Sequence, residues 1–176
     1  MQITILSGVQ GSGKTTYLQQ FAASAARWGK TVGGIASPAV FEGGRRVGYD
    51  LLDLRSGCRR PLARLDNGLP APTKIGVYAF DDAAIAEGND RILDAVKAGA
   101  SIIVVDEIGP LEFRGGGWSR ALAFAIEKCA TECELILTIR PSLADDLAAR
   151  FPSPFWQTAR RVVPPWPALG SRARIT

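Results

Sequence analysis

The 176-residue chain contains no histidine. This absence excludes the mechanisms that need an imidazole, namely Ser-His-Asp hydrolysis, Cys-His nucleophiles, phosphohistidine intermediates, and zinc or iron sites with histidine ligands. A general base in this protein must therefore be a carboxylate.

Long hydrophobic runs are missing too. No apolar stretch approaches the roughly 20 residues that span a bilayer, and the N-terminus lacks the charged start, apolar stretch and small-residue cleavage site of a signal peptide. We therefore expect no membrane association and a cytoplasmic location.

Cysteine is scarce, since the chain has three: Cys58, Cys129 and Cys133. An odd and sparse set suits a reducing compartment better than a disulfide framework. Cys129 and Cys133 fall on one face of a predicted helix, together with Leu122 and Ile126. We interpret both cysteines as core residues rather than as a redox or metal pair.

Length and charge set further bounds. One ordinary domain fits into 176 residues and two full-sized domains do not, so we expect a single domain over residues 1–176. The net charge of +4 and the pI near 9.2 suit a protein that handles polyanions, and a nucleoside triphosphate alone would account for them. Nucleic acid stays open as a partner, but no aromatic platform with interleaved basic residues supports it, and the sequence does not indicate an oligomeric state.

The most informative motif is the run GVQGSGKTT at residues 8–16, which matches the phosphate-loop pattern GxxxxGK(S/T). Its glycines permit a sharp exit from a strand and aim backbone amides inward as an anion nest, and the positive end of the following helix points at the same place. Lys14 adds a positive charge for the β and γ phosphates, and Thr15 offers a hydroxyl to Mg²⁺. The expected nucleotide-binding residues are Gly8, Val9, Gln10, Gly11, Ser12, Gly13, Lys14, Thr15 and Thr16.

A second motif, IIVVDEIG at residues 102–109, is an apolar strand that ends in two adjacent carboxylates. In a parallel sheet this end lies at the same edge as the phosphate loop. We expect Asp106 to hold Mg²⁺, usually through water, and Glu107 to polarise a water molecule for in-line attack on the γ-phosphate. Asp106 and Gly109 also fit the DxxG element of GTPases, but the chain has no NKxD sequence to read guanine.

Strand and helix patterns alternate along the chain, which predicts an α/β fold with a mostly parallel central sheet and helices on both faces. Predicted strands cover residues 3–6, 31–37, 46–54, 75–80, 101–105, 135–139 and 157–163. Predicted helices cover residues 18–25, 85–96, 118–131 and 143–151, the second of them interrupted at Gly88-Asn89. We expect the Gly-, Pro- and Arg-rich residues 38–73 to form an insertion or hairpin and residues 164–176 an irregular tail.

Arginines are candidates for stabilising charge on the transferred phosphoryl group. The middle region supplies Arg45, Arg46, Arg55, Arg59, Arg60 and Arg64. We single out Arg46, which immediately precedes VGYD, and interpret the others as surface charges. Arg114 and Arg140 follow strand ends and are weaker candidates.

Four runs make the chain resemble the THEP-type nucleoside-triphosphatase family: GVQGSGKTT, RVGYD at residues 46–50, IGVYAF at 75–80 and, most specifically, VVDEIGPLEF at 104–113. The resemblance covers roughly residues 1–150. It implies a RecA-like P-loop fold and slow hydrolysis of several nucleoside triphosphates to the diphosphate and phosphate.

The resemblance also implies roles for single residues. Thr15 and Asp106 would bind magnesium, Glu107 would be the base, and residues 8–16 would bind the nucleotide. Arg46 matches the arginine of the family's R-x-G-(F/Y) element. The family's second acid falls on Glu112, for which we expect a structural role, whereas the C-terminal VVPPWPALGSRARIT departs from the family pattern.

The leading hypothesis is therefore a magnesium-dependent nucleoside triphosphatase that accepts several bases. Two alternatives stay open. One is a small-metabolite or nucleotide kinase of the same fold, in which the middle arginines close over an acceptor. The other is a nucleotide-gated module that binds RNA or protein.

Overall fold

The computed structural model describes residues 1–66 and 73–169. Ten strands form one sheet. They are β1 (Gln2–Ser7), β2 (Val32–Ala36), β3 (Ala39–Glu42), β4 (Arg45–Asp53), β5 (Arg59–Leu65), β6 (Thr73–Ile75), β7 (Tyr78–Phe80), β8 (Ile102–Ile108), β9 (Glu134–Ile139) and β10 (Arg160–Val162). The helices are α1 (Lys14–Arg27), α2 (Asp82–Lys97), α3 (Pro110–Phe113), α4 (Ser119–Lys128), α5 (Pro141–Ala144), α6 (Leu147–Arg150) and the 3₁₀ helix η1 (Pro154–Thr158).

The first half of the sheet, in the order β10-β1-β9-β8-β2, is parallel throughout. Strand β9 lies between β1 and β8, and it pairs with β1 from Gln2↔Glu134 to Ser7↔Ile139. The carboxyl ends of β1, β8 and β9 therefore meet at one edge of the sheet, where the segments after β1 and the end of β8 face each other.

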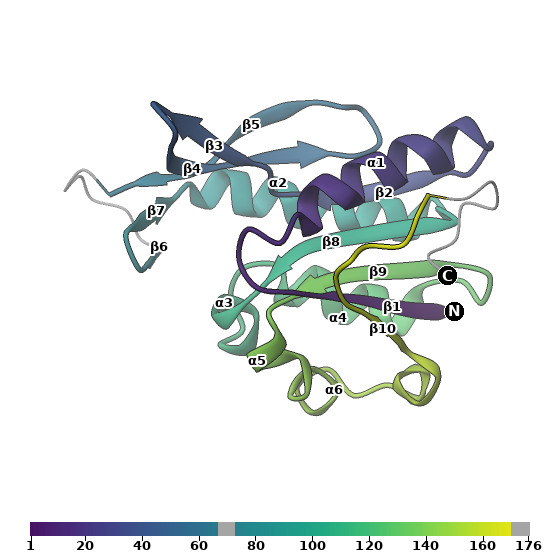
Figure 1. The fold of residues 1–176 in the computed structure, drawn as a ribbon. Helices are drawn as coiled ribbons and strands as arrows, with labels where there is room; N and C mark the ends of the chain where they lie inside the picture. The colour runs from purple at the N-terminus through teal and green to yellow at the C-terminus, as the bar shows by residue number, and fades with distance from the viewer. Residues whose placement is uncertain (67–72, 170–176) are drawn as a thin grey trace.

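Helices cover both faces of this parallel half (Figure 1). On one face α1 packs Leu18 and Phe21 against Leu6 and Val104. The opposite face is covered by α2 and α4, which bury the larger apolar cluster. The predicted α/β fold with a mostly parallel sheet and helices on both faces is thus confirmed. Among the described residues, no helix combines the length and apolar character needed to cross a bilayer.

The second half of the sheet is antiparallel and contains the Gly-, Pro- and Arg-rich region. Strand β4 pairs antiparallel with both β2 and β5, and β3 folds back onto β4. The strand predicted over residues 75–80 is instead the hairpin of β6 and β7, because the chain turns at Gly76, which has a φ of 57°. This hairpin lies at the outer end of the sheet (Figure 1).

Three other predicted elements differ from the structure. The strand predicted over residues 157–163 is shorter, because residues 154–158 form η1 and only β10 (Arg160–Val162) is extended. The helix predicted over residues 143–151 is two single turns, α5 and α6, and both Ala144 and Leu147 are buried in the core. Helix α4 ends at Lys128, so Cys133 does not share its face but lies just before β9. Cys133 is nevertheless a buried core residue, as predicted.

The predicted interruption of α2 at Gly88-Asn89 is wrong, because tertiary contacts favour the helix there. A Cβ atom on Gly88 would lie 2.4 Å from Cζ3 of Trp118, so only glycine lets the two elements approach this closely. Asn89 donates through Nδ2 to the carbonyl oxygens of Ile85 (2.9 Å) and Gly117 (2.8 Å). Gly88 and Asn89 have low helix propensity, but here both contact the segment before α4 and hold α2 against it.

The Gly88→Ala substitution should lower the free energy of unfolding by about 1–3 kcal/mol, although alanine favours a helix by roughly 1 kcal/mol over glycine. The reason is the overlap of the new methyl group with the Trp118 ring. Urea unfolding of Gly88→Ala, Trp118→Phe and the double variant checks this. Phenylalanine lacks part of the tryptophan ring, so Gly88→Ala should cost less in the Trp118→Phe background; equal costs in both backgrounds would contradict the explanation.

Candidate active site

The loop between β1 and α1 has the backbone that an anion nest requires. Gly11 and Gly13 take left-handed conformations with φ of 81° and 83°, which other residues adopt at a cost. Gly13 is the N-cap of α1, and Gly8 leaves room for the Ser12 side chain, whose Oγ would lie 2.5 Å from a Cβ at Gly8. The positive end of a 14-residue helix thus points into the loop.

Lys14 lies inside this loop. Its side chain is buried, and Nζ donates to the carbonyl oxygens of Gly8 at 2.8 Å and Val9 at 3.1 Å. The third hydrogen of the ammonium group is left for an anion, and the two carbonyl bonds hold the charge at the mouth of the nest. This position suits a phosphate-binding lysine.

The carboxylate of Asp106 is fully buried and accepts hydrogen bonds at both oxygens. Oδ2 accepts from Thr15 Oγ1 at 2.8 Å and from the backbone N–H of Ser37 at 2.9 Å. Oδ1 accepts from Thr138 Oγ1 at 2.5 Å and from the Glu107 N–H at 3.0 Å. The predicted pair Thr15 and Asp106 is therefore in direct contact.

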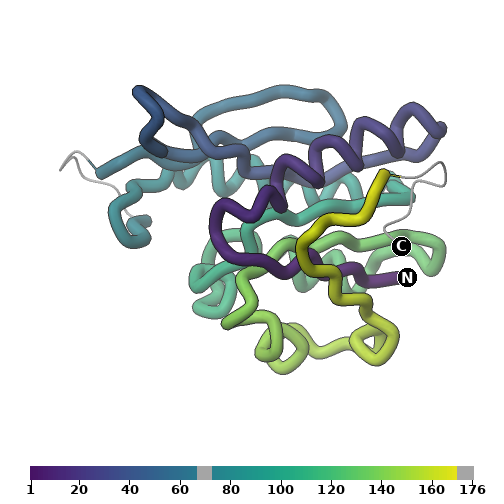
Figure 2. Tube along the Cα trace, in the orientation of Figure 1, coloured from purple at the N-terminus to yellow at the C-terminus, as the bar shows by residue number. Residues whose placement is uncertain are grey.

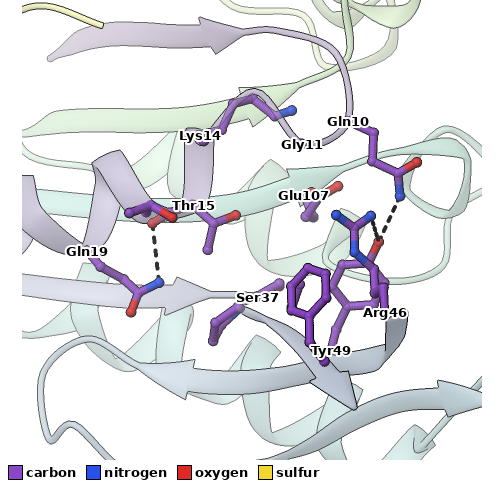
Figure 3. Close-up of a pocket in the computed structure, with 14 residues that line it drawn as sticks. Gln10, Gly11, Lys14, Thr15, Gln19, Ser37, Arg46, Tyr49 and Glu107 are labelled. Atoms are coloured by element: carbon purple, nitrogen blue, oxygen red, sulfur yellow. Dashed lines mark hydrogen bonds between the residues drawn. The ribbon is translucent and has the colours of Figure 1, made fainter. Parts of the chain in front are cut away.

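Glu107 is the one described non-glycine residue with a positive φ, at 61°. The β8–β9 register shifts between Val105 and Ile108, so Glu107 forms a bulge, and its N–H donates to Thr138 Oγ1 at 2.8 Å. The bulge places the Glu107 side chain at the cavity beside the phosphate loop (Figure 3). Burial and the neighbouring Asp106 charge raise the pKa of Glu107, while the positive charges of Lys14, Arg140 and Arg46 oppose that rise.

That cavity has a volume of about 250 Å³ and is bounded by the phosphate loop, the start of α1 and the β3–β4 hairpin. Arg46 lies on its wall opposite the loop (Figure 3), where Nη1 donates to Tyr49 Oη at 3.3 Å and the guanidinium lies 5.5 Å from the Phe41 ring centre. Gln10 also donates to Tyr49 Oη, at 3.0 Å. The structure thus brings Arg46 to the same cavity as Lys14 and Glu107.

The other arginines divide into two groups. Six of them do not line this cavity: Arg45, Arg55, Arg59, Arg60, Arg64 and Arg114. Three of the six are in surface ion pairs, as interpreted from the sequence; Arg59 and Arg64 pair with Asp50, each at 2.6 Å. Arg140 instead lies near Glu107, and its charge opposes the rise in the pKa of that residue. It is therefore closer to the acidic pair than a weaker candidate was expected to be.

Glu112 is buried behind the acidic pair and organises the segment after β8. Oε2 accepts from the Gly109 N–H at 2.7 Å and Oε1 from the Trp118 N–H at 2.9 Å. Burial raises the pKa of Glu112 to about 7, against the opposing effect of these two N–H donors. These contacts are those of a structural residue.

Three residues at the site were not found from the sequence. Thr138 and Ser37 hold Asp106, and the signal for Thr138 was a lone hydroxyl near the end of the apolar run LILTI. Trp166 donates through Nε1 to the Ser12 carbonyl at 2.7 Å and stacks on Tyr17 with ring centres 5.7 Å apart. Figure 2 shows this yellow tail segment passing beside the purple segment that joins β1 to α1. Residues 67–72 of the expected insertion or hairpin and residues 170–176 of the expected irregular tail lie outside the described residues.

A phosphate loop after β1, an acidic pair on β8 and one strand between them define a P-loop NTPase fold. A family model described as NTPase matches residues 3–153, and the chain belongs to this family. The resemblance to THEP-type nucleoside-triphosphatases is thereby confirmed.

Similar proteins agree with this assignment. The nucleoside-triphosphatase THEP1 of Methanopyrus kandleri is 36% identical over 126 residues, which cover 72% of this chain and 66% of that protein. The THEP1 of Pyrococcus abyssi is 33% identical over 144 residues, covering 80% and 75% of the two chains. The solution structure of a human cancer-related nucleoside triphosphatase matches with a TM-score of 0.69 at 24% identity, covers 93% of this chain and 88% of that one, and supports the fold.

The Thr138→Val substitution should slow phosphate release by about tenfold or more, because Asp106 loses a donor and the Glu107 bulge loses its acceptor. The free energy of unfolding should fall by about 1–3 kcal/mol. Phosphate-release assays and urea unfolding measure the two effects. Thr138→Ser keeps the hydroxyl and serves as the matched control; a serine variant as slow as the valine variant would argue against the hydroxyl's role.

Stability at alkaline pH should report the buried Glu112. With a folded-state pKa of about 7 and an ordinary value of 4.5, the unfolded chain releases this proton at lower pH than the folded protein does. Glu112→Gln does not titrate at this position. The difference in free energy of unfolding between the wild type and this variant should therefore fall by up to about 3 kcal/mol as pH rises from 4.5 to 8. Unfolding curves of both proteins across this range test the expectation; a constant difference would contradict it.

Proposed function

We propose that this protein hydrolyses nucleoside triphosphates to diphosphates and phosphate with Mg²⁺, slowly and with little preference for the base. The observation that carries the proposal is the contact between Thr15 of the phosphate loop and Asp106, with Glu107 beside it at the same cavity. Slow turnover and breadth of base choice follow from the family resemblance. The absence of an NKxD sequence also supports breadth, since guanine has no dedicated reader.

Each residue of the site would have its own role in the transfer of the γ-phosphoryl group to water. The loop amides and Lys14 would hold the β and γ phosphates, and Arg46 would add positive charge from the opposite wall. Glu107 would take a proton from a water molecule as that oxygen bonds to the γ-phosphorus and the bond to the bridging oxygen breaks. Its raised pKa makes it a stronger base than an exposed glutamate.

The magnesium site is the pair Thr15 and Asp106. A hydroxyl and a carboxylate oxygen, 2.8 Å apart, are the hard donors that Mg²⁺ prefers, and this ion takes few protein ligands beside water and phosphates. The described residues contain no group of three His, Cys, Asp or Glu side chains that could hold a metal on their own. When bound, the ion would neutralise charge on the β and γ phosphates.

The cellular setting belongs to the same proposal. We take residues 1–176 as one domain, which the single ten-stranded sheet supports, and the cytoplasm as its location, which the sparse cysteines support.

The Glu107→Gln variant should release phosphate about 10²–10⁴ times more slowly than the wild type, because glutamine cannot accept the proton from water. Binding of a fluorescent nucleotide should persist, since the phosphate loop is unchanged. Phosphate release with ATP, GTP, CTP and UTP, with and without Mg²⁺, measures the rates and the base preference. Glu127→Gln, an exposed glutamate on α4, is the control. A Glu107→Gln rate equal to the wild-type rate would overturn the mechanism.

A further inference from the structure

A second cavity, of about 400 Å³, opens beside Glu107 on the side away from the phosphate loop's helix. It lies between the β6–β7 hairpin and the segment that holds α3. Gln10, Ser37, Tyr49 and Glu107 line both cavities, so the two are neighbours that share one polar wall. A molecule in the second cavity would therefore reach the base from the side opposite the nucleotide.

The far walls of this cavity are apolar and rich in aromatic rings. They include Leu62, Tyr78, Phe80, Ile85, Leu111 and Trp118. Tyr49 and Tyr78 meet edge to face, with ring centres 5.3 Å apart. Such walls favour a flat apolar or aromatic body over a sugar or a hydrated ion.

The mouth of the cavity carries a positive charge. Arg140, the residue after β9, lines it, and its side chain forms no hydrogen bond or ion pair within the described residues, although its charge influences the nearby Glu107. A guanidinium with five free N–H donors complements a carboxylate, sulfonate or phosphate. Charge complementarity therefore indicates an anionic group on the occupant.

The nucleoside of the bound triphosphate is not this occupant. In the proposed function Lys14 and Thr15 would bind the β and γ phosphates, so the γ end would point at Glu107 and the nucleoside would extend in the other direction. Gln19, on the wall of the first cavity, lies across Thr15 from Glu107 and marks that direction (Figure 3). Since only four of the described residues line both cavities, a nucleotide in the first would leave the apolar walls of the second uncovered.

We propose that this second cavity binds a small aromatic or heteroaromatic anion, with its ring against the apolar walls and its charge on Arg140, at the same time as the nucleoside triphosphate. The occupant covers Glu107 from the open side and so restricts the approach of water. Binding is independent of the proposed hydrolysis, and only the effect on the rate rests on the proposed function.

The dye 8-anilinonaphthalene-1-sulfonate is a suitable probe, because it joins two aromatic systems to one sulfonate. Its fluorescence titration on the wild-type protein should saturate at one site and persist in saturating non-hydrolysable ATP analogue. Arg140→Gln should weaken the dye about tenfold, and Ile75→Glu, which places a negative charge in the apolar wall, by a similar factor. Arg120→Gln and Val163→Glu are the matched controls, since both positions are exposed and line no part of this cavity.

Circular dichroism of each variant shows whether it has folded, and the dye should lower kcat of the wild type with KM for the nucleotide unchanged. The proposal is overturned if the dye fails to bind, if the analogue displaces it, or if the cavity variants bind it as well as the controls do. Dye binding that follows these expectations in a protein without phosphate release would refute the proposed hydrolysis and leave the site standing.

Discussion

The rest of the site depends on one buried carboxylate, that of Asp106. A charged group without solvent contact is stable only when its oxygens are hydrogen-bonded, and here four donors approach it from four segments: α1, the turn after β2, β8 itself and β9. Removing any one of these segments would take a donor from a buried charge. The cost of burying the carboxylate therefore enforces the relative placement of the phosphate loop and the acidic strand.

This network also explains how Glu107 can keep a left-handed backbone. A φ of 61° is unfavourable for a glutamate by roughly 1–2 kcal/mol, and its N–H bonds to Thr138 Oγ1 and Asp106 Oδ1 offset that strain. Without the bulge, the alternation of the strand would turn Glu107 away from the side on which it now faces the cavity. The Thr138 hydroxyl thus donates to Asp106, the carboxylate that suits a metal, and accepts from the N–H of Glu107, which it orients.

What the sequence could predict here was local. The phosphate loop and the acidic pair are contiguous motifs, and the order of strands and helices was sufficient for the sheet and its two helical layers. Thr138, Arg140 and Trp166 act across gaps of more than 30 residues to reach Asp106, Glu107 and Ser12, and no short pattern encodes such distances.

Gly88 illustrates the opposite failure. The low helix propensity of glycine correctly marks residue 88 as a special position. The helix nevertheless continues through it, because the Trp118 ring must approach α2 closely there. Glycine is there because any side chain would separate α2 from the segment before α4. A glycine in a helical pattern therefore has two explanations, and only knowledge of the partner element distinguishes them.

Between the two cavities, Glu107 is the acidic side chain that both share, and its surroundings differ on the two sides. On one side lie Lys14 and Arg46, which suit phosphate; on the other lie aromatic walls, which suit an apolar body. The polar residues Gln10 and Ser37 line both cavities and join these two environments. Glu107 therefore stands where a cavity suited to phosphate meets an apolar one, and its burial there, together with the neighbouring Asp106 charge, raises its pKa above the value of an exposed glutamate.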